Sequence, residues 1–312
     1  MIKQTVDIRD AFFDQIYNIA AKDKDVVFIT ADADAFSLRK FKKDFPDQFI
    51  NVGVAEQNMV TVAAGLALSG KRVFIYAIIP FITLRCLEHI KVNICSMNLP
   101  VTIIGAGAGL SFGNDGATHH AIDDIAIMRI LPEITIFNPI DDCSAAASAQ
   151  IAYESGAPAY VRLDKGVFNR LYSSKTDCAS GYKVLKAVSD VNVLSTGFMT
   201  HVSIKAAGEL KKEFINIGII DVFRLKPINK ELFLNTIAAS KQLISFEENS
   251  IVGGLGTIIS EILIDNWANI QLKRIALKDR QCFDYGTREW LHDLYNVNKQ
   301  SLIKIVKDVA KK

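Results

Sequence analysis

Residues 49–70 read FINVGVAEQNMVTVAAGLALSG, a β-branched run that leads directly into a helical stretch of Val, Ala and Leu. Glu56 stands at the junction, where the pattern predicts another apolar residue. Its carboxylate could simply complement the dipole of the following helix, a contribution of about 0.3–1 kcal/mol. Alternatively it has a catalytic role, because apolar surroundings favour a neutral carboxyl group that shares a proton with a ring nitrogen.

Outward from this junction, short β-branched runs alternate with helical segments. The runs predicted as strands are VVFIT, FINVGV, RVFIYAII, LPVTIIGAG, ITIFNPI and AYVRL, and helices are expected over 56–69, 84–97 and 141–154. Nearly continuous apolar strands separated by helices predict a mainly parallel sheet with helices on both faces. The fold class is therefore α/β, and each domain is expected to have three α/β/α layers.

The chain is predicted to contain two domains, because 312 residues exceed the size of one ordinary core. A polar stretch, RLYSSKTDCASGYK, follows residue 169, and a second α/β pattern begins near residue 183 with VNVLSTG, INIGIIDV, QLISFEE and GGLGTIISEIL. We expect a first domain over 1–170, a linker over 171–183 and a smaller second domain over 184–312.

The overall composition excludes several functions. The 36 basic and 34 acidic residues leave a net charge of +2, which gives no electrostatic case for binding nucleic acid or an anionic membrane. The N-terminal stretch has charges at helical spacing and is predicted to be an amphipathic helix, not a signal peptide. The longest apolar run, VFIYAIIPFITL, is too short to cross a bilayer.

The five cysteines are scattered and odd in number, without CxxC spacing. This pattern argues against a disulfide framework or a zinc site, and it favours the reducing cytoplasm. We expect no metal ligands in this chain, and the TADAD stretch containing Asp32 and Asp34 is as compatible with an ordinary turn as with a metal pair.

Polar or aromatic side chains follow most of the predicted strands. In open α/β sheets, ligands bind beyond the carboxyl ends of the strands, so residues in these positions are expected to converge. The residues in such positions are Asp32, Asp34, Glu56, Phe81, Asp115, His119 and Arg162.

Each of these residues also has a structural interpretation. His119 and His120 lie at the start of a predicted helix, where adjacent side chains point in different directions and a shared metal is not expected. His119 could bind a sugar hydroxyl or a phosphate, or it could be a partly buried structural histidine. Arg162 could clamp a phosphate with two N–H groups or form a surface ion pair. Phe81 is by default a core residue, and its place after a strand makes it a candidate for ring stacking.

The glycine-rich stretches do not indicate a dinucleotide site. Neither GAGAG at 105–109 nor GGLG at 253–256 completes the GxGxxG spacing. The second stretch opens a helix, and tight packing of that helix against a strand is the simpler explanation.

Four motifs in the right order resemble the C-terminal half of transketolase and its thiamine-diphosphate-dependent relatives over essentially the whole chain. GVAEQNM resembles the family's G-[IV]-A-E-Q-[NH]-M stretch, and AYVRL resembles its arginine-bearing strand. The other two matches are DGATHHAIDDIAIMRILPEITIFNPID and SFEENSIVGGLG. The resemblance implies a thiamine-diphosphate pyrimidine-binding domain followed by a transketolase C-terminal-type domain.

The resemblance also implies cofactor-binding roles. Glu56 would bind N1′ of the aminopyrimidine and promote the proton transfer that activates the thiazolium, which makes Glu56 and His119 the expected catalytic residues. Phe81 would stack on the pyrimidine ring, although the IIPFITLR loop is spaced differently from several relatives and Ile79 or Ile82 could take that place. Asp32 is similar to an aspartate near the thiazolium.

Substrate binding is implied for three further positions. Asp115 and His119 would hydrogen-bond the sugar hydroxyls of donor and acceptor, and Arg162 with His119 would hold the substrate phosphate. In the family, Gln or Gly follows this arginine, whereas Leu163 and Asp164 follow it here. A carboxylate so close could pair with the guanidinium and weaken phosphate binding.

The sequence lacks the family's G-D-G…N stretch, which holds Mg²⁺ on the diphosphate; NDG at 114–116 already belongs to another motif. The resemblance therefore implies a split enzyme in which an N-terminal transketolase subunit supplies Mg²⁺ (or Ca²⁺) and the diphosphate site. This chain would be the smaller subunit of an α₂β₂ assembly and would also self-associate.

Three alternatives to a transketolase transferring ketol units between sugar phosphates stay open. The chain could be a β subunit of a 2-oxo-acid dehydrogenase or resemble 1-deoxyxylulose-5-phosphate synthase, although the T-H-H run and Arg162 favour the sugar enzyme. It could also be a binding or regulatory module on the same fold.

Overall fold

The computed structural model describes residues 6–173, 178 and 180–310. The chain divides into two compact units, the first made of Met1–Ala108 and Ile127–Thr176, and the second of Gly109–Ala126 and Asp177–Lys312. The expected linker over 171–183 lies partly outside the described residues. Among the described helices, none combines the length and the apolar character needed to cross a membrane.

The first unit is built on a parallel sheet whose strands lie in the order β5-β6-β4-β3-β1-β2. The strands are β1 (Val26–Thr30), β2 (Phe49–Asn51), β3 (Arg72–Ile78), β4 (Val101–Ala106), β5 (Thr135–Phe137) and β6 (Ala159–Leu163). Every residue of β1, β4 and β6 is buried, which explains their unbroken apolar sequences. The predicted parallel sheet is confirmed.

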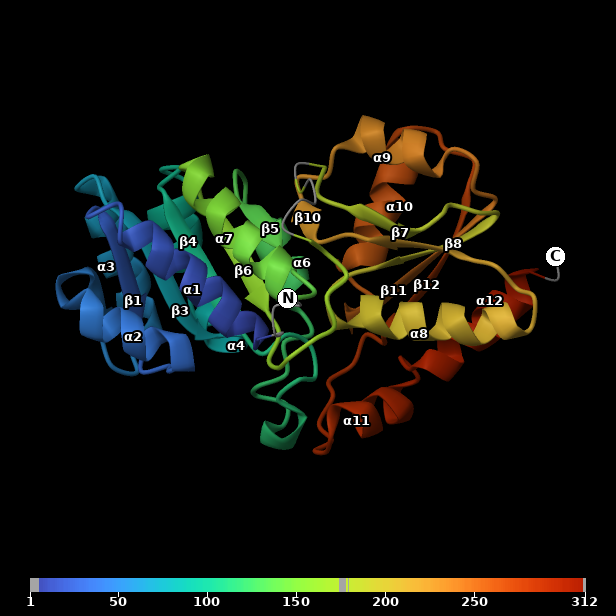
Figure 1. Cartoon of the computed structure of the whole chain (residues 1–312), viewed down its shortest axis with the longest axis horizontal. Coiled ribbons are helices and arrows are strands. Elements are labelled where there is room, and N and C mark those ends of the chain that lie inside the picture. Colours follow the sequence, from blue (N-terminus) through green and yellow to red (C-terminus); the bar gives the residue numbers. More distant parts are fainter. Residues whose placement is uncertain (1–5, 174–177, 179, 311–312) are drawn as a thin grey trace. The chain divides into compact units, whose positions relative to one another are not determined.

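Helices pack on this sheet in the first unit. They are α1 (Ile8–Ala20), α2 (Phe36–Asp44), α3 (Glu56–Leu68), α4 (Ile79–Ile82), α5 (Leu87–His89) and α7 (Asp142–Ser155). Helices α1 and α7 lie side by side, and α3 packs against β3 (Figure 1). The N-terminal amphipathic helix is confirmed as α1, whose Asp7 cap accepts a hydrogen bond from the N–H of Arg9.

Two predicted elements of this unit differ from the structure. The FINVGV strand ends at Asn51, because Gly53 adopts a φ of +73° and turns the chain toward α3. The helix expected over 84–97 is interrupted: α5 has a single turn and continues as a π-helical segment, η2 (Ile90–Cys95).

The second unit contains a five-stranded sheet in the order β12-β11-β8-β9-β7, in which only β7 runs antiparallel to its neighbour. Its strands are β7 (Lys183–Lys186), β8 (Val191–Ser195), β9 (Gly218–Asp221), β11 (Gln242–Ser250) and β12 (Gln271–Leu277), and β10 (Arg224–Lys226) follows β9 along the chain. The α/β class expected for this part of the chain is confirmed.

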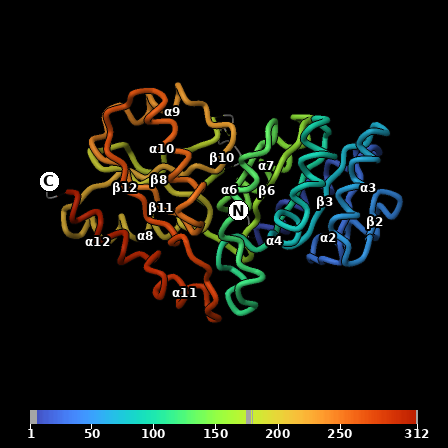
Figure 2. The backbone as a smooth tube through the Cα atoms, turned by 180° about the vertical axis from the view of Figure 1, so that it is seen from behind, coloured from blue at the N-terminus to red at the C-terminus, as the bar shows by residue number. Residues whose placement is uncertain are grey.

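The helices of the second unit are α8 (Phe198–Lys212), α9 (Lys230–Ile237), α10 (Leu255–Asp265), α11 (Arg288–Tyr295) and α12 (Lys299–Ala310). In the views from the front and from behind, α10 lies on one side of the sheet, and α8 with α12 lies on the other (Figure 1 and Figure 2). Between these layers, the core is aliphatic and includes Val193, Ile219, Ile244 and Phe246.

Candidate active site

Glu56 begins α3, and its side chain is buried. The residue is 4% exposed, whereas a glutamate that only complements a helix dipole lies in solvent. The Glu56 carboxylate accepts a hydrogen bond from Nη1 of Arg85 at 2.7 Å. The expectation of purely apolar surroundings is wrong, because a cation from 29 positions along the chain pairs with the buried acid.

Arg85 also contacts the ring of Phe81. Its guanidinium carbon lies 4.5 Å from the ring centroid, so one planar group touches both the aromatic ring and the Glu56 carboxylate. The backbone carbonyl of Arg85 accepts a hydrogen bond from Gln57 Nε2 at 3.1 Å. Our sequence analysis missed Arg85, although its spacing of four from Phe81 suggests side chains on one face of a helical turn.

Two apolar neighbours complete this corner of the first unit. Burial, and then the charge of Glu56, raises the pKa of the Cys86 thiol to about 12, so the thiol stays protonated at neutral pH. Ile79 is fully buried, and a Cβ at Gly105 would lie 2.5 Å from its Cγ1. Ile79 therefore packs in the core, and its expected contact with a cofactor ring stays a prediction.

The aspartates after β1 have separate partners. Asp32 adopts a φ of +59°, and its backbone N–H donates to Asn51 Oδ1 at 3.1 Å. Asp34 pairs with Arg39 at 3.2 Å. A left-handed non-glycine residue is costly and often marks a functional turn, which is compatible with the expected role of Asp32.

Arg162 lies within β6 and is 4% exposed, so it does not form the surface ion pair that was one interpretation of the sequence. In the sheet register its neighbour on β4 is Gly105. Asp164, which follows β6, is also buried, and its Oδ1 accepts the N–H of Lys165 at 2.7 Å. The expected phosphate-binding role of Arg162 stays a prediction.

Asp115 and His119 belong to the second unit, in the loop that precedes α6 (Asp124–Arg129). Asp115 is exposed and His119 is partly exposed. His119 does not begin a helix as predicted, because residues 117–119 form a turn and α6 starts five residues later. The His119 ring stands edge-on to Phe112, with 6.2 Å between the centroids.

His120 has a structural environment that differs from that of its neighbour. It is buried, and its Nδ1 lies 3.0 Å from the carbonyl oxygen of Cys282. Loss of solvent lowers the pKa of His120, so the neutral imidazole is favoured there. The two adjacent histidines thus occupy different surroundings, one partly open to solvent and one in the protein interior.

The loop carrying Asp115 and His119 is attached to the rest of its unit through Glu248. Oε1 of Glu248 accepts the N–H of Leu110 at 3.1 Å and lies 2.6 Å from Nε2 of His292. Arg288 donates to both Glu248 oxygens, with Nε at 2.9 and 3.1 Å. Although burial opposes ionisation, Arg288 and His292 hold the pKa of Glu248 well below its usual range.

Glu247 has a different role in the same motif. Its two oxygens accept the N–H groups of Leu255 and Gly256 at 2.7 and 2.8 Å, at the start of α10. A Cβ on Gly254 would lie 2.1 Å from Oε2 of Glu247. The GGLG stretch therefore serves close packing of helix and strand, as expected.

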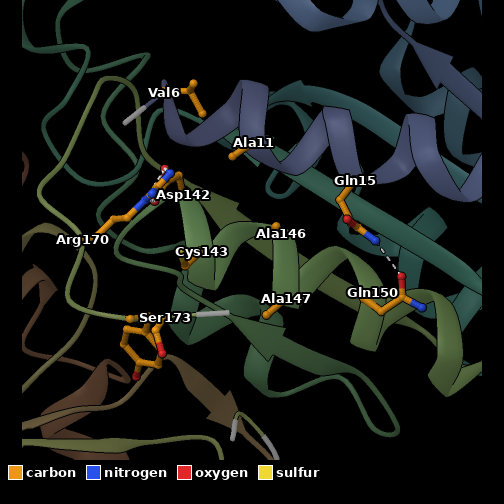
Figure 3. A pocket seen from close by; sticks show the side chains of 11 residues that line it. Val6, Ala11, Gln15, Asp142, Cys143, Ala146, Ala147, Gln150, Arg170 and Ser173 are labelled. Carbon is orange, nitrogen blue, oxygen red and sulfur yellow. Dashed lines mark hydrogen bonds and ion pairs between the residues drawn. The ribbon is translucent and has the colours of Figure 1, made fainter. Parts of the chain in front are cut away.

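The first unit also has a pocket of about 690 Å³ between α1, α7 and the segment after β6. Figure 3 shows the Asp142–Arg170 ion pair at one end of this pocket and the hydrogen bond between Gln15 and Gln150, 2.8 Å long, at the other. None of the expected site residues lines the pocket, so the candidate site is not placed there.

Comparisons with known proteins agree with this arrangement. Residues 4–169 match the transketolase pyrimidine-binding domain, and residues 181–302 match the transketolase C-terminal domain. A solved split-gene transketolase, described as an inactive β4 tetramer, superimposes with a TM-score of 0.87 at 30% identity and covers 98% of both chains. A transketolase from Pichia stipitis has a TM-score of 0.82 at 17% identity, and this chain covers 46% of it.

Two curated relatives match this chain over most of their length. One is the 6-deoxy-6-sulfo-D-fructose transketolase subunit SqwH of Clostridium sp. (strain MSTE9), 30% identical over 98% of this chain and 95% of the relative. The other is a subunit of the apulose-4-phosphate transketolase of Actinobacillus succinogenes, 31% identical over 90% and 91%, respectively. The chain therefore belongs to the transketolase family and corresponds to its pyrimidine-binding and C-terminal domains, the part found in the subunits of split transketolases.

Proposed function

We propose that this chain is the small subunit of a split transketolase that uses thiamine diphosphate to transfer a two-carbon ketol unit between sugar phosphates. The observation that carries the proposal is the buried Glu56 carboxylate at the start of α3, next to Phe81, in a chain of this family. The relatives named above take their names from sugar substrates, which supports a sugar enzyme over other thiamine-diphosphate chemistry.

The residues around Glu56 fit the aminopyrimidine of the cofactor. A planar, nitrogen-rich group, the guanidinium of Arg85, already contacts the Phe81 ring and donates an N–H to Glu56. The site therefore accepts a flat group that stacks on the ring and hydrogen-bonds to the acid. An aminopyrimidine has the same two requirements, which supports this assignment.

Glu56 would share its proton with N1′ of the ring, and burial of its carboxylate keeps water from competing for that proton. When bound, thiamine diphosphate supplies the carbon nucleophile that attacks the ketose carbonyl. Phe81 would hold the pyrimidine by stacking, with Ile79 as the alternative contact, and Asp32 would lie toward the thiazolium.

Asp115 and His119 would hydrogen-bond the hydroxyl groups of the donor and acceptor sugars. Arg162 with His119 would hold the substrate phosphate, since a guanidinium offers two parallel N–H donors to phosphate oxygens. His119 would also be the second catalytic residue, because an imidazole beside a reacting hydroxyl can accept and return a proton.

The diphosphate and its Mg²⁺ (or Ca²⁺) would be held by a partner subunit in an α₂β₂ assembly. Two relatives are named as subunits over nearly their whole length, and this supports a separate partner chain. The β4 tetramer of the split-gene transketolase supports self-association through this chain. The five free thiols are compatible with a cytoplasmic enzyme.

The test is reconstitution with the partner subunit, thiamine diphosphate and Mg²⁺, followed by assay of ketol transfer between sugar phosphates. We expect turnover from the mixture and none from this chain alone. Glu56→Ala should lower turnover by roughly 10²–10⁴-fold, whereas the control Glu88→Ala, a glutamate of α5, should not. Full turnover by this chain alone, or by the Glu56→Ala complex, would contradict the proposal.

A second candidate is a 1-deoxyxylulose-5-phosphate synthase-like reaction. The enzyme of Halothermothrix orenii is 30% identical over 94% of this chain, but the chain covers 46% of that protein. Offering pyruvate with glyceraldehyde 3-phosphate, and pyruvate with a lipoyl acceptor, distinguishes this enzyme and a 2-oxo-acid dehydrogenase from a transketolase.

A further inference from the structure

The side chain of Arg85 bridges the two groups to which the proposed function assigns the pyrimidine ring. Its Nη1 lies 2.7 Å from Oε2 of Glu56, and its guanidinium carbon lies 4.5 Å from the centroid of Phe81. Thus one guanidinium occupies the space beside the buried carboxylate and covers the aromatic ring.

Guanidinium and aminopyrimidine groups resemble each other chemically. Both are flat, both contain an N–C–N unit, and both can present an N–H edge to a carboxylate while a face lies on an aromatic ring. Two flat groups cannot lie against the same carboxylate edge and the same ring at once. The contacts of Arg85 and those proposed for the pyrimidine ring therefore exclude each other.

We propose that Arg85 is a displaceable occupant of the pyrimidine site, which holds the site when no cofactor is bound and leaves when the cofactor enters. This inference rests on the proposed function, because it takes Glu56 and Phe81 as the residues that bind the ring. It adds a residue that controls cofactor affinity.

The exposure of the two partners fits such an exchange. The Glu56 side chain is 5% exposed and the Arg85 side chain is 44% exposed. A buried carboxylate without a partner is unfavourable, and the guanidinium supplies that partner while the site is empty. Because Arg85 is already close to solvent, its charge can return to water when the ring replaces it.

The backbone near Arg85 does not need to move for this exchange. Gln57 Nε2 donates to the carbonyl oxygen of Arg85 at 3.1 Å, and the Cys86 thiol donates to the carbonyl oxygen of Phe81 at 3.3 Å. These contacts tie the segment to itself and to α3 through main-chain atoms. Rotation about side-chain bonds is therefore enough to release Glu56.

An occupant that must leave weakens the apparent affinity of the ligand that replaces it. Replacing Arg85 should therefore strengthen cofactor binding, contrary to the usual effect of removing a binding-site residue. We expect Arg85→Ala to lower the Kd for thiamine diphosphate by roughly five- to tenfold, and Arg85→Gln, which keeps a flat N–H donor without charge, to give an intermediate value.

The measurement is a calorimetric titration of thiamine diphosphate, with Mg²⁺ present, into the complex of this chain and its partner subunit. Arg274→Ala is the matched control, because Arg274 is an exposed arginine that hydrogen-bonds to the carbonyl of Ile251 in the second unit. This control should bind the cofactor as the wild type does. Unchanged or weaker binding by Arg85→Ala would overturn the inference.

A structural readout accompanies the titration. A crystal structure of the cofactor-loaded complex should show the Arg85 guanidinium away from Glu56, and one in which it still lies there would overturn the inference. The failure of the proposed function is distinguishable, because in that case neither the wild-type complex nor any Arg85 variant binds thiamine diphosphate.

Discussion

Glu248 accepts a hydrogen bond from the backbone N–H of Leu110, a residue 138 positions earlier in the chain, at 3.1 Å. The same carboxylate pairs with Arg288 and His292, both of which are well buried. Through this contact, β11 holds the first residues of the loop that carries Asp115 and His119. The loop with the proposed substrate-binding residues thus depends on a buried charge cluster of its own unit.

Glu248→Ala should destabilise the protein by about 3–5 kcal/mol, because it leaves buried cations and a backbone N–H without their partner. Urea unfolding followed by circular dichroism measures the loss. Glu213→Ala is the control, since Glu213 pairs with Lys307 at the surface and should contribute less than about 1 kcal/mol. Equal losses for the two variants would contradict the role given to Glu248.

Gly109→Ala should destabilise the same loop by at least about 1 kcal/mol, since Gly109 has a φ of +61°. An added Cβ would also lie 2.3 Å from Oε2 of Glu248. Gly208→Ala in α8 is the matched control: nothing lies within 4 Å of its added Cβ, and a gain of about 0.5–1 kcal/mol is expected. Thermal unfolding compares the two, and a stabilised Gly109→Ala protein would refute the packing argument.

His120 should make stability depend on pH. Because burial lowers its pKa in the folded chain below the unfolded value near 6.5, the neutral ring stabilises the fold above that pH. This contribution is lost as the pH falls from about 6.5 toward the lower folded value. The free energy of unfolding between pH 7.5 and 5 should therefore fall more steeply in the wild type than in His120→Gln. Parallel curves for the two proteins would count against this assignment.

His119→Gln should affect activity and leave stability nearly unchanged. Loss of the proposed proton-transferring and phosphate-binding group should reduce kcat/KM by about 100-fold or more, while the free energy of unfolding changes by less than about 0.5 kcal/mol because the residue is partly exposed. Steady-state kinetics of the reconstituted complex and urea unfolding give the two numbers. Asn114→Ala, an exposed change in the same loop, is the control. Undiminished kcat/KM would rule out the proposed role of His119.

Much of the fold followed from local patterns. VVFIT and AYVRL coincide with β1 and β6, because strands buried on both faces need unbroken apolar sequences. Glu56 begins α3 as predicted, since the switch from a β-branched to a helical pattern marks this boundary. The early end of β2 and the π-helical segment η2 were not predictable, because they depend on a turn at Gly53 and on the packing of a short helix.

The sequence by itself determined the α/β class, the family motifs and the position of the acid at the start of α3, because periodicity and spacing are properties of neighbouring residues. Only the tertiary structure decided which charges meet. The partner of Glu56 is 29 residues away and that of Leu110 is 138 residues away, and no local pattern specifies either distance. Such pairs form because the folded backbone brings buried charges together where solvent can no longer compensate them.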